Sequence, residues 1–170
     1  MSINISGLSK SFSHVRVHDD FNLKIKTGER LGISGPNGCG KTTLLKIISG
    51  IMSFEGGEIL INEEYLRPDN PESRRETYYL GHSTGFYRRL TATENLIFIA
   101  NLYNKKNPNV QEILEIIGLD KNEKKQIRFF SKGMLQRLKI GACIILDCKI
   151  LLLDEPISSL DEEGINLFHN

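Results

Sequence analysis

The sequence lacks any apolar run of the roughly 20 residues that span a bilayer, and its N-terminus has no apolar segment of signal-peptide length. Its three cysteines, at positions 39, 143 and 148, are an odd number without C-x-x-C spacing. This argues against a disulfide framework or a zinc site and favours a reducing compartment. The net charge is only +1, so the chain lacks the basic excess that attracts nucleic acid or anionic lipid. We expect no nucleic acid partner, and any membrane role must come through another protein.

The composition, 39% hydrophobic and 25% charged, is that of an ordinary globular domain. Apolar runs at residues 30–34 and 149–153 predict strands buried on both faces, and residues 15–26 and 58–61 predict further strands. The middle of the chain has helical patterns instead. This order predicts an α/β fold with a mostly parallel central sheet, an N-terminal antiparallel β subdomain and an inserted helical subdomain.

Three helices are predicted from their end signals. A capping box at residues 91–94 opens the first, and residues 107–108, an Asn-Pro pair, open the second, which Gly118 ends. The third begins after Ser131. Gly141 inside it costs about 1 kcal/mol relative to alanine, so packing must offset that cost.

The segment GPNGCGKT at residues 35–42 fits the pattern G-x-x-x-x-G-K-[ST] at every fixed position. Gly38 and Gly40 allow successive backbone N–H groups to turn inward as an anion-binding nest at a helix N-terminus. Lys41 is expected to reach the β- and γ-phosphates, and the Thr42 hydroxyl to ligate Mg²⁺. The expected nucleotide-binding residues here are Gly35, Pro36, Asn37, Gly38, Cys39, Gly40, Lys41, Thr42 and Thr43.

A phosphate-binding loop needs a carboxylate for the metal, and KILLLDE supplies two at the end of an apolar run. Ligands bind at the carboxyl ends of strands in such sheets. Asp154 is therefore expected to hold the Mg²⁺ shell, and Glu155 to orient or deprotonate the attacking water. No N-K-x-D motif for guanine is present, whereas kinase-like enzymes remain open on the loop alone.

The string FSKGM at residues 130–134 resembles the signature of the ATP-binding cassette (ABC) ATPases, L-S-G-G-Q. Ser131 and Gly133 match that signature, while Lys132 and Met134 depart from it. The sequence stays similar to the family through the acidic pair. In the SSLD segment that follows, Asp161 matches the family's D-loop, and Phe12 occupies the place of the aromatic residue that stacks on adenine.

The resemblance implies an ATPase that uses ATP and Mg²⁺ and works in pairs. In this family two cassettes pack head to tail, so a homodimer or heterodimer is implied, with each ATP between one phosphate-binding loop and the other cassette's signature helix. Ser131 and the helix behind it would face a γ-phosphate. The implied partner is a transmembrane permease, which would hold the chain on the cytoplasmic face of the membrane and use its ATP hydrolysis for transport.

We expect a single cassette over residues 1–170, with its core at 1–85 and 135–170 and its helical subdomain at about 86–134. The family places a histidine on a further strand after the acidic pair, whereas this chain ends fifteen residues after Glu155. His169 lies too close to that pair to be the same residue. We therefore expect the C-terminal part of the cassette to be missing, and ATP hydrolysis by the chain to be slow.

His82 holds the position of the family's Q-loop glutamine. A neutral imidazole there can bind water or approach Mg²⁺, and it would add pH sensitivity near neutrality. Around it, LGH and the following LTATENL resemble the haem-exporter ATPases of cytochrome c maturation. SKGMLQRL is instead similar to exporters of drugs and polysaccharides, so the transported substrate stays open.

Two other functions remain as alternatives to transport. One is a soluble ABC ATPase acting on ribosomes or nucleic acid, although ninety residues between Lys41 and Ser131 leave no room for the long coiled coil of DNA-repair members. The other is a nucleotide-binding fragment without turnover.

Overall fold

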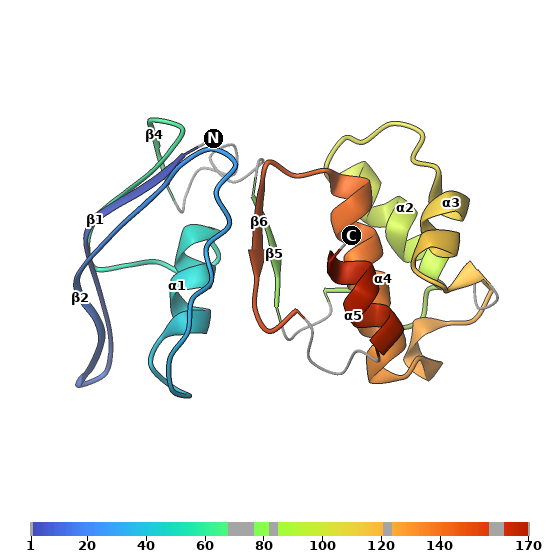
Figure 1. Cartoon of the computed structure of the whole chain (residues 1–170), viewed down its shortest axis with the longest axis horizontal. Coiled ribbons are helices and arrows are strands. Elements are labelled where there is room, and N and C mark those ends of the chain that lie inside the picture. Colours follow the sequence, from blue (N-terminus) through green and yellow to red (C-terminus); the bar gives the residue numbers. More distant parts are fainter. Residues whose placement is uncertain (1, 68–76, 82–84, 121–123, 157–161, 170) are drawn as a thin grey trace. The chain divides into compact units, whose positions relative to one another are not determined.

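The computed structural model describes residues 2–67, 77–81, 85–120, 124–156 and 162–169, except the side chains of residues 163 and 167–169. The chain divides into two compact units (Figure 1). The first contains Met1–Tyr79 and Lys149–Asp154. The second contains Leu80–Cys148 and Glu155–Asn170.

An antiparallel sheet with the strand order β2-β1-β3-β4 forms one layer of the first unit. Its strands are β1 (Ile3–Phe12), β2 (Val15–Ile25), β3 (Gly56–Ile61) and β4 (Glu64–Tyr65). Ile5 of β1 lies opposite Leu23 of β2 and Ile59 of β3, so apolar residues from three strands share one face. The strands expected at residues 15–26 and 58–61 are confirmed.

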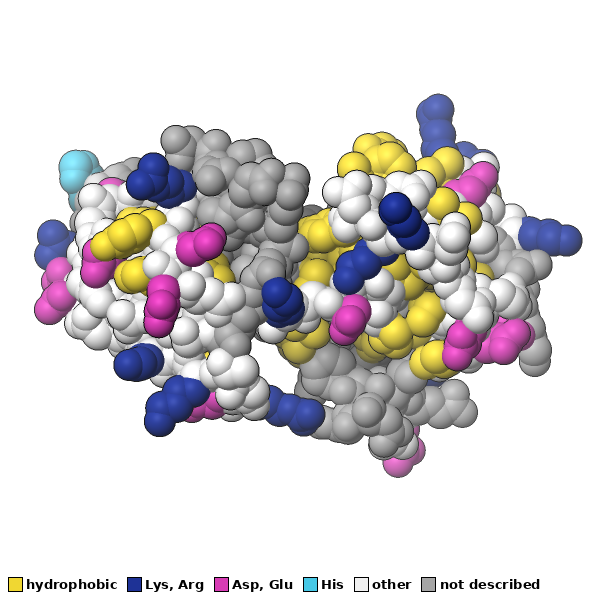
Figure 2. All heavy atoms as spheres, turned by 90° about the horizontal axis from the view of Figure 1, so that it is seen from above, with side chains coloured by type: hydrophobic (Ala, Val, Ile, Leu, Met, Phe, Trp, Pro, Cys, Tyr) yellow, Lys and Arg dark blue, Asp and Glu magenta, His cyan; other side chains and the backbone are white. Residues whose placement is uncertain are grey.

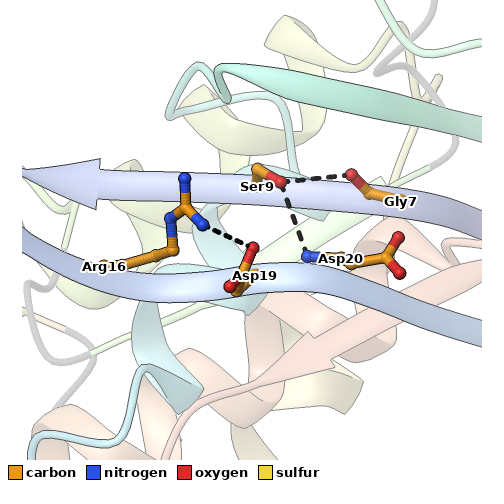
Figure 3. Close-up of polar contacts among 5 residues, drawn as sticks. All are labelled: Gly7, Ser9, Arg16, Asp19 and Asp20. Atoms are coloured by element: carbon orange, nitrogen blue, oxygen red, sulfur yellow. Dashed lines mark hydrogen bonds and ion pairs between the residues drawn. The ribbon is translucent and has the colours of Figure 1, made fainter.

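Side chains supply hydrogen bonds where the pairing of β1 with β2 slips. The register shifts between Leu8 and Lys10. There the Ser9 hydroxyl donates to the Gly7 carbonyl at 3.4 Å and accepts from the Asp20 backbone N–H at 3.5 Å (Figure 3). These contacts replace backbone bonds that the irregular ladder lacks. Further along β2, Arg16 pairs with Asp19 at 2.8 Å, but both side chains are exposed and the pair contributes little to stability.

Helix α1 (Lys41–Ile48) packs its apolar face into the core of the first unit. Leu44, Ile47 and Ile48 are buried at helical spacing. They join Ile3, Ile5, Leu8, Ile59, Ile61, Leu66, Ile150 and Leu152 in one buried cluster. This core fixes the start of α1, and therefore the end of the loop before it.

A two-stranded sheet is made of β5 (Thr77–Leu80) and β6 (Ile150–Leu153). β6 confirms the strand expected at 149–153. The strand expected at residues 30–34 is wrong, because these residues form no strand, and Leu31 and Ile33 are 47% and 39% exposed. An apolar run becomes a buried strand only where neighbouring strands pair with it, and no sheet among the described residues includes 30–34.

The second unit is helical. Its helices are α2 (Ala92–Leu102), α3 (Val110–Ile116), the short 3₁₀ helix η3 (Ile127–Phe129), α4 (Lys132–Leu146) and α5 (Glu162–His169). The predicted capping box is confirmed: Thr91 accepts from the Glu94 N–H at 3.2 Å, and the Glu94 carboxylate accepts from the Thr91 N–H at 2.7 Å. No helix in the described ranges combines the length and the apolar character that a bilayer span requires.

The predicted start of α3 is wrong by two residues. Asn109, not Asn107, is its N-cap, and the Asn109 side chain accepts from the Glu112 backbone N–H. Asn107 has φ +49°, a left-handed conformation, whereas a capping residue normally has extended backbone. At the other end, Gly118 follows the helix with φ +66°, as expected.

Helix α4 begins after Ser131, as predicted, and Gly141 lies inside it. A Cβ atom at Gly141 would lie 2.8 Å from Ile117 Cδ1 and 3.2 Å from Ile113 Cγ2. The missing side chain therefore lets α4 and α3 approach closely, and this packing offsets the low helix propensity of glycine.

Candidate nucleotide-binding site

The loop at residues 35–40 leads directly into α1, and its backbone has the form of an anion-binding nest. Gly38 has φ +82° and Gly40, the N-cap of α1, has φ +100°. Left-handed residues in such a turn direct successive N–H groups to one side, and the helix N-terminus adds its positive dipole. The motif therefore adopts the local geometry that phosphate binding requires.

Side chains of β2 lie so close to position 40 that the residue there must be glycine. A Cβ atom there would lie 2.5 Å from Val17 Cγ1 and 3.0 Å from two atoms of the His18 ring, so only glycine fits. The His18 side chain is buried, and its Nε2 donates to the Gly40 carbonyl at 3.2 Å. The same carbonyl accepts from the Leu44 N–H, the first hydrogen bond of the helix. No local pattern marks this histidine, because its role depends on a contact between β2 and the loop.

Lys41 closes the loop from the other side. Its Nζ donates to the Gly35 carbonyl at 2.7 Å and to the Pro36 carbonyl at 2.9 Å. The ammonium group thus lies against the backbone that forms the nest, where an anion in the loop would meet it. Asn37, another predicted loop residue, is exposed, and Thr43 is half-buried in the first turn of α1.

Thr42 and Asp154 meet although 112 positions separate them. The Thr42 hydroxyl lies 3.0 Å from Oδ1 and 2.9 Å from Oδ2 of Asp154, to which it donates. The Tyr79 hydroxyl of β5 donates to the same Oδ2 at 2.9 Å. Burial, the hydrogen bond and the negative charge of Asp154 raise the pKa of Tyr79 well above its usual value, so it remains a donor.

This pair of oxygen donors fits a hydrated Mg²⁺. Hydroxyl and carboxylate oxygens are the ligands Mg²⁺ prefers, and it usually takes one or two from protein while keeping waters and phosphate oxygens. No cluster of three or more His, Cys, Asp or Glu side chains that could hold a metal ion occurs in the part of the chain that is described.

Glu155 is exposed and has φ +52°, an uncommon value for a non-glycine residue. Uncommon backbone geometry of this kind clusters at functional sites.

Phe12, at the end of β1, is 45% exposed, and the Lys10 ammonium lies 5.3 Å from its ring centroid. The side chain is therefore accessible to solvent, as stacking on a base would require.

Within the second unit, Ser131 caps α4 by accepting from the Met134 N–H at 3.1 Å, and Gly133 lies in the first turn.

Two buried side chains of α4 donate hydrogen bonds to backbone carbonyls beside predicted site residues. Gln136 donates to the Pro156 carbonyl at 2.5 Å, next to Glu155. Lys139 donates to the Gly81 carbonyl at 2.6 Å, next to His82, and burial lowers the pKa of this lysine. Neither residue was predicted, because neither belongs to a motif. His82 and Asp161 themselves lie outside the described residues.

Residues 18–158 match the family described as ABC transporter. The chain belongs to the ABC transporter family. Its structure is similar to a solved ATP binding subunit of an ABC transporter, with a TM-score of 0.88 and 29% identity over 98% of this chain and 71% of that one. This similarity confirms the α/β P-loop NTPase fold class that the sequence predicts.

Two curated members of the ABC family are similar in sequence to this chain. The spermidine/putrescine import ATP-binding protein PotA of Fusobacterium nucleatum subsp. nucleatum is 37% identical over 94% of this chain and 43% of its own length. The bacitracin transport ATP-binding protein BcrA of Bacillus licheniformis is 36% identical over 96% of this chain and 54% of its own length. The chain thus spans about half the length of the curated relatives it matches.

Cys39 provides a direct probe of this loop. Its side chain is exposed, and its Sγ lies 3.8 Å from the Lys41 ammonium. Burial raises the pKa of the Cys143 thiol to about 12 and also raises that of Cys148. Because the thiolate is the reactive form, maleimide should modify Cys39 first. We expect saturating MgATP to slow this labelling at least severalfold, as followed by mass spectrometry. Prior labelling should block ATP binding, as measured by calorimetry.

The matched control is the Cys39→Ser variant, which should bind ATP and label only slowly at the two remaining cysteines. Equal labelling of Cys39 with and without saturating MgATP would show that nucleotide does not occupy this loop.

Proposed function

We propose that this chain is the ATP-binding and ATP-hydrolysing part of a transporter. The observation that carries the proposal is the contact of Thr42 with Asp154, which joins the phosphate-binding loop to the acidic pair. Each segment alone is a common local structure. Together they provide an anion nest, a cation and metal ligands within one unit.

The loop is suited to hold the phosphates of ATP. The N–H groups of residues 38–42 and the α1 N-terminus would bind phosphate oxygens, and Lys41 would exchange a carbonyl partner for the β- and γ-phosphates. Thr42 and Asp154 would hold Mg²⁺, which when bound neutralises charge on the phosphates. Phe12 would stack on the adenine ring.

Glu155 is the candidate for activating water. It directly follows the metal-binding carboxylate and its side chain is exposed, so it can accept a proton from a water molecule near the γ-phosphate. Since Asp154 holds the metal and Glu155 the water, the two neighbouring acids have separate roles in binding and in turnover.

A second cassette would complete the site. Ser131 and the N-terminus of α4, with Gly133 in the first turn, would face the γ-phosphate bound by the partner cassette. Asp161 and His82 would contribute near the same interface and near the attacking water. The buried links from Gln136 and Lys139 support this role, because they connect α4 to the backbone beside Glu155 and beside His82.

A membrane permease is the proposed partner, so the chain would act at the cytoplasmic face of a membrane. Hydrophobic side chains gather on the helical unit in the view of Figure 2, and its exposed apolar residues include Tyr87, Ile97, Phe98, Leu102 and Phe129. The Tyr87 and Phe98 rings pack edge to face with centroids 4.8 Å apart. Exposed aromatic and aliphatic side chains favour a protein interface.

The test is steady-state phosphate release from MgATP by the purified protein, measured alone and with the membrane protein that copurifies with it from detergent-solubilised membranes. We expect saturable hydrolysis that this partner stimulates. Hydrolysis no faster than that of the Lys41→Ala variant, under both conditions, would contradict the proposal.

A further inference from the structure

Tyr79 contacts the proposed metal site from a strand that no motif marks. It lies on β5, its ring packs against the core of the first unit, and β5 is the neighbour of β6. Asp154 directly follows β6. The pairing of these two strands therefore places the tyrosine hydroxyl beside the carboxylate, at 2.9 Å from Oδ2.

The two donors to Asp154 differ in how they constrain it. The Thr42 hydroxyl is almost equidistant from both oxygens, at 3.0 Å and 2.9 Å, so it does not distinguish them. Tyr79 contacts only Oδ2. A carboxylate offers about four acceptor sites on its two oxygens. The tyrosine contact thus leaves Oδ1 as the oxygen with more acceptor capacity, and it opposes rotation of the carboxylate.

We propose that Tyr79 is a positioning residue for the divalent cation that accompanies ATP. By holding Oδ2, it presents Oδ1 of Asp154 to the cation or to one of its water ligands. Outer hydrogen bonds that orient a metal-binding carboxylate typically change metal affinity by about 10–100-fold. The inference rests on the proposed function, since it assumes that nucleotide and Mg²⁺ bind at residues 38–42 and Asp154.

The alternative is that Tyr79 only packs in the core. The substitution Tyr79→Phe separates the two roles, because it keeps the ring and removes only the hydroxyl. A purely structural role would leave the Mg²⁺ requirement of nucleotide binding unchanged. A positioning role would raise that requirement without weakening the contacts that the loop itself makes with phosphate.

The experiment titrates MgCl₂ into protein mixed with a fluorescent ATP analogue and records the half-saturating Mg²⁺ concentration. A parallel titration in EDTA gives the affinity for metal-free nucleotide. For Tyr79→Phe we expect the half-saturating Mg²⁺ concentration to rise by about 10–100-fold. The metal-free affinity should stay within about twofold of wild type, since hydrogen bonding in the loop is unchanged.

Two further variants make the result decisive. Tyr65→Phe, which removes the hydroxyl of an exposed tyrosine on β4, should behave as wild type. Adding Tyr79→Phe to Asp154→Asn should have no further effect on the Mg²⁺ requirement, because the tyrosine acts through that carboxylate.

An unchanged Mg²⁺ requirement in Tyr79→Phe, with wild-type protein that binds nucleotide in a Mg²⁺-dependent manner, would overturn this inference and leave the proposed function intact. An equal loss of metal-free and Mg²⁺-dependent affinity would also overturn it and assign Tyr79 to packing. Wild-type protein with no saturable nucleotide binding would overturn both.

Discussion

Replacing Lys41 by alanine is expected to weaken MgATP binding by about 100-fold or more. The ammonium group donates to the Gly35 and Pro36 carbonyls, so its loss removes both a cation for the phosphates and two bonds that close the loop. A hydrogen bond to a charged group contributes about 1.5–3 kcal/mol, and the upper value alone corresponds to two orders of magnitude in affinity. Isothermal titration calorimetry with MgATP measures the change.

Lys46→Ala is the matched control, because Lys46 lies on the same helix but in its last turn. It should bind MgATP as the wild type does, which would separate the role of Lys41 from a general loss of positive charge. Similar affinities for Lys41→Ala and wild type would remove the loop from the binding site.

Replacing Glu155 by glutamine is expected to slow ATP hydrolysis by about 10²–10⁴-fold, the usual contribution of a general base. MgATP affinity should change by no more than a few-fold, because Lys41, Thr42 and Asp154 keep their contacts. Phosphate release at saturating ATP gives the first quantity, and calorimetry the second. A large loss of affinity, comparable to that of Lys41→Ala, would contradict the separate roles of binding and turnover.

Glu162→Gln serves as the control for this variant. Glu162 is an exposed acid at the start of α5 and has no role in the proposed site, so it tests whether removing a negative charge elsewhere in the chain slows turnover. We expect its hydrolysis rate to remain within about twofold of wild type, since exposed charges act weakly at a distance in salt.

The loop could be predicted from sequence because its chemistry is local. The phosphate-binding motif spans eight consecutive residues, and the positive φ values of Gly38 and Gly40 agree with what the motif requires. Helix ends with reciprocal side-chain contacts, such as the pair Thr91 and Glu94, were equally clear. In each case the residues that matter are neighbours in the chain.

The errors and omissions arise where distant segments decide the structure. The apolar run at residues 30–34 predicted a strand, but pairing with another strand determines whether one forms. Asn107 and Asn109 are both plausible caps, and backbone conformation selects the second. His18 and Tyr79 contact residues 22 and 75 positions away, so no local pattern could reveal them.

The most direct test of the central claim, that ATP binds at residues 35–42 beside Asp154, is a titration of isotope-labelled protein with MgATP followed by amide chemical shifts. We expect the resonances of residues 38–43 and of Asp154 to shift saturably with a single dissociation constant, and these shifts to vanish in Lys41→Ala. Saturable shifts that leave residues 38–43 unaffected would contradict the account.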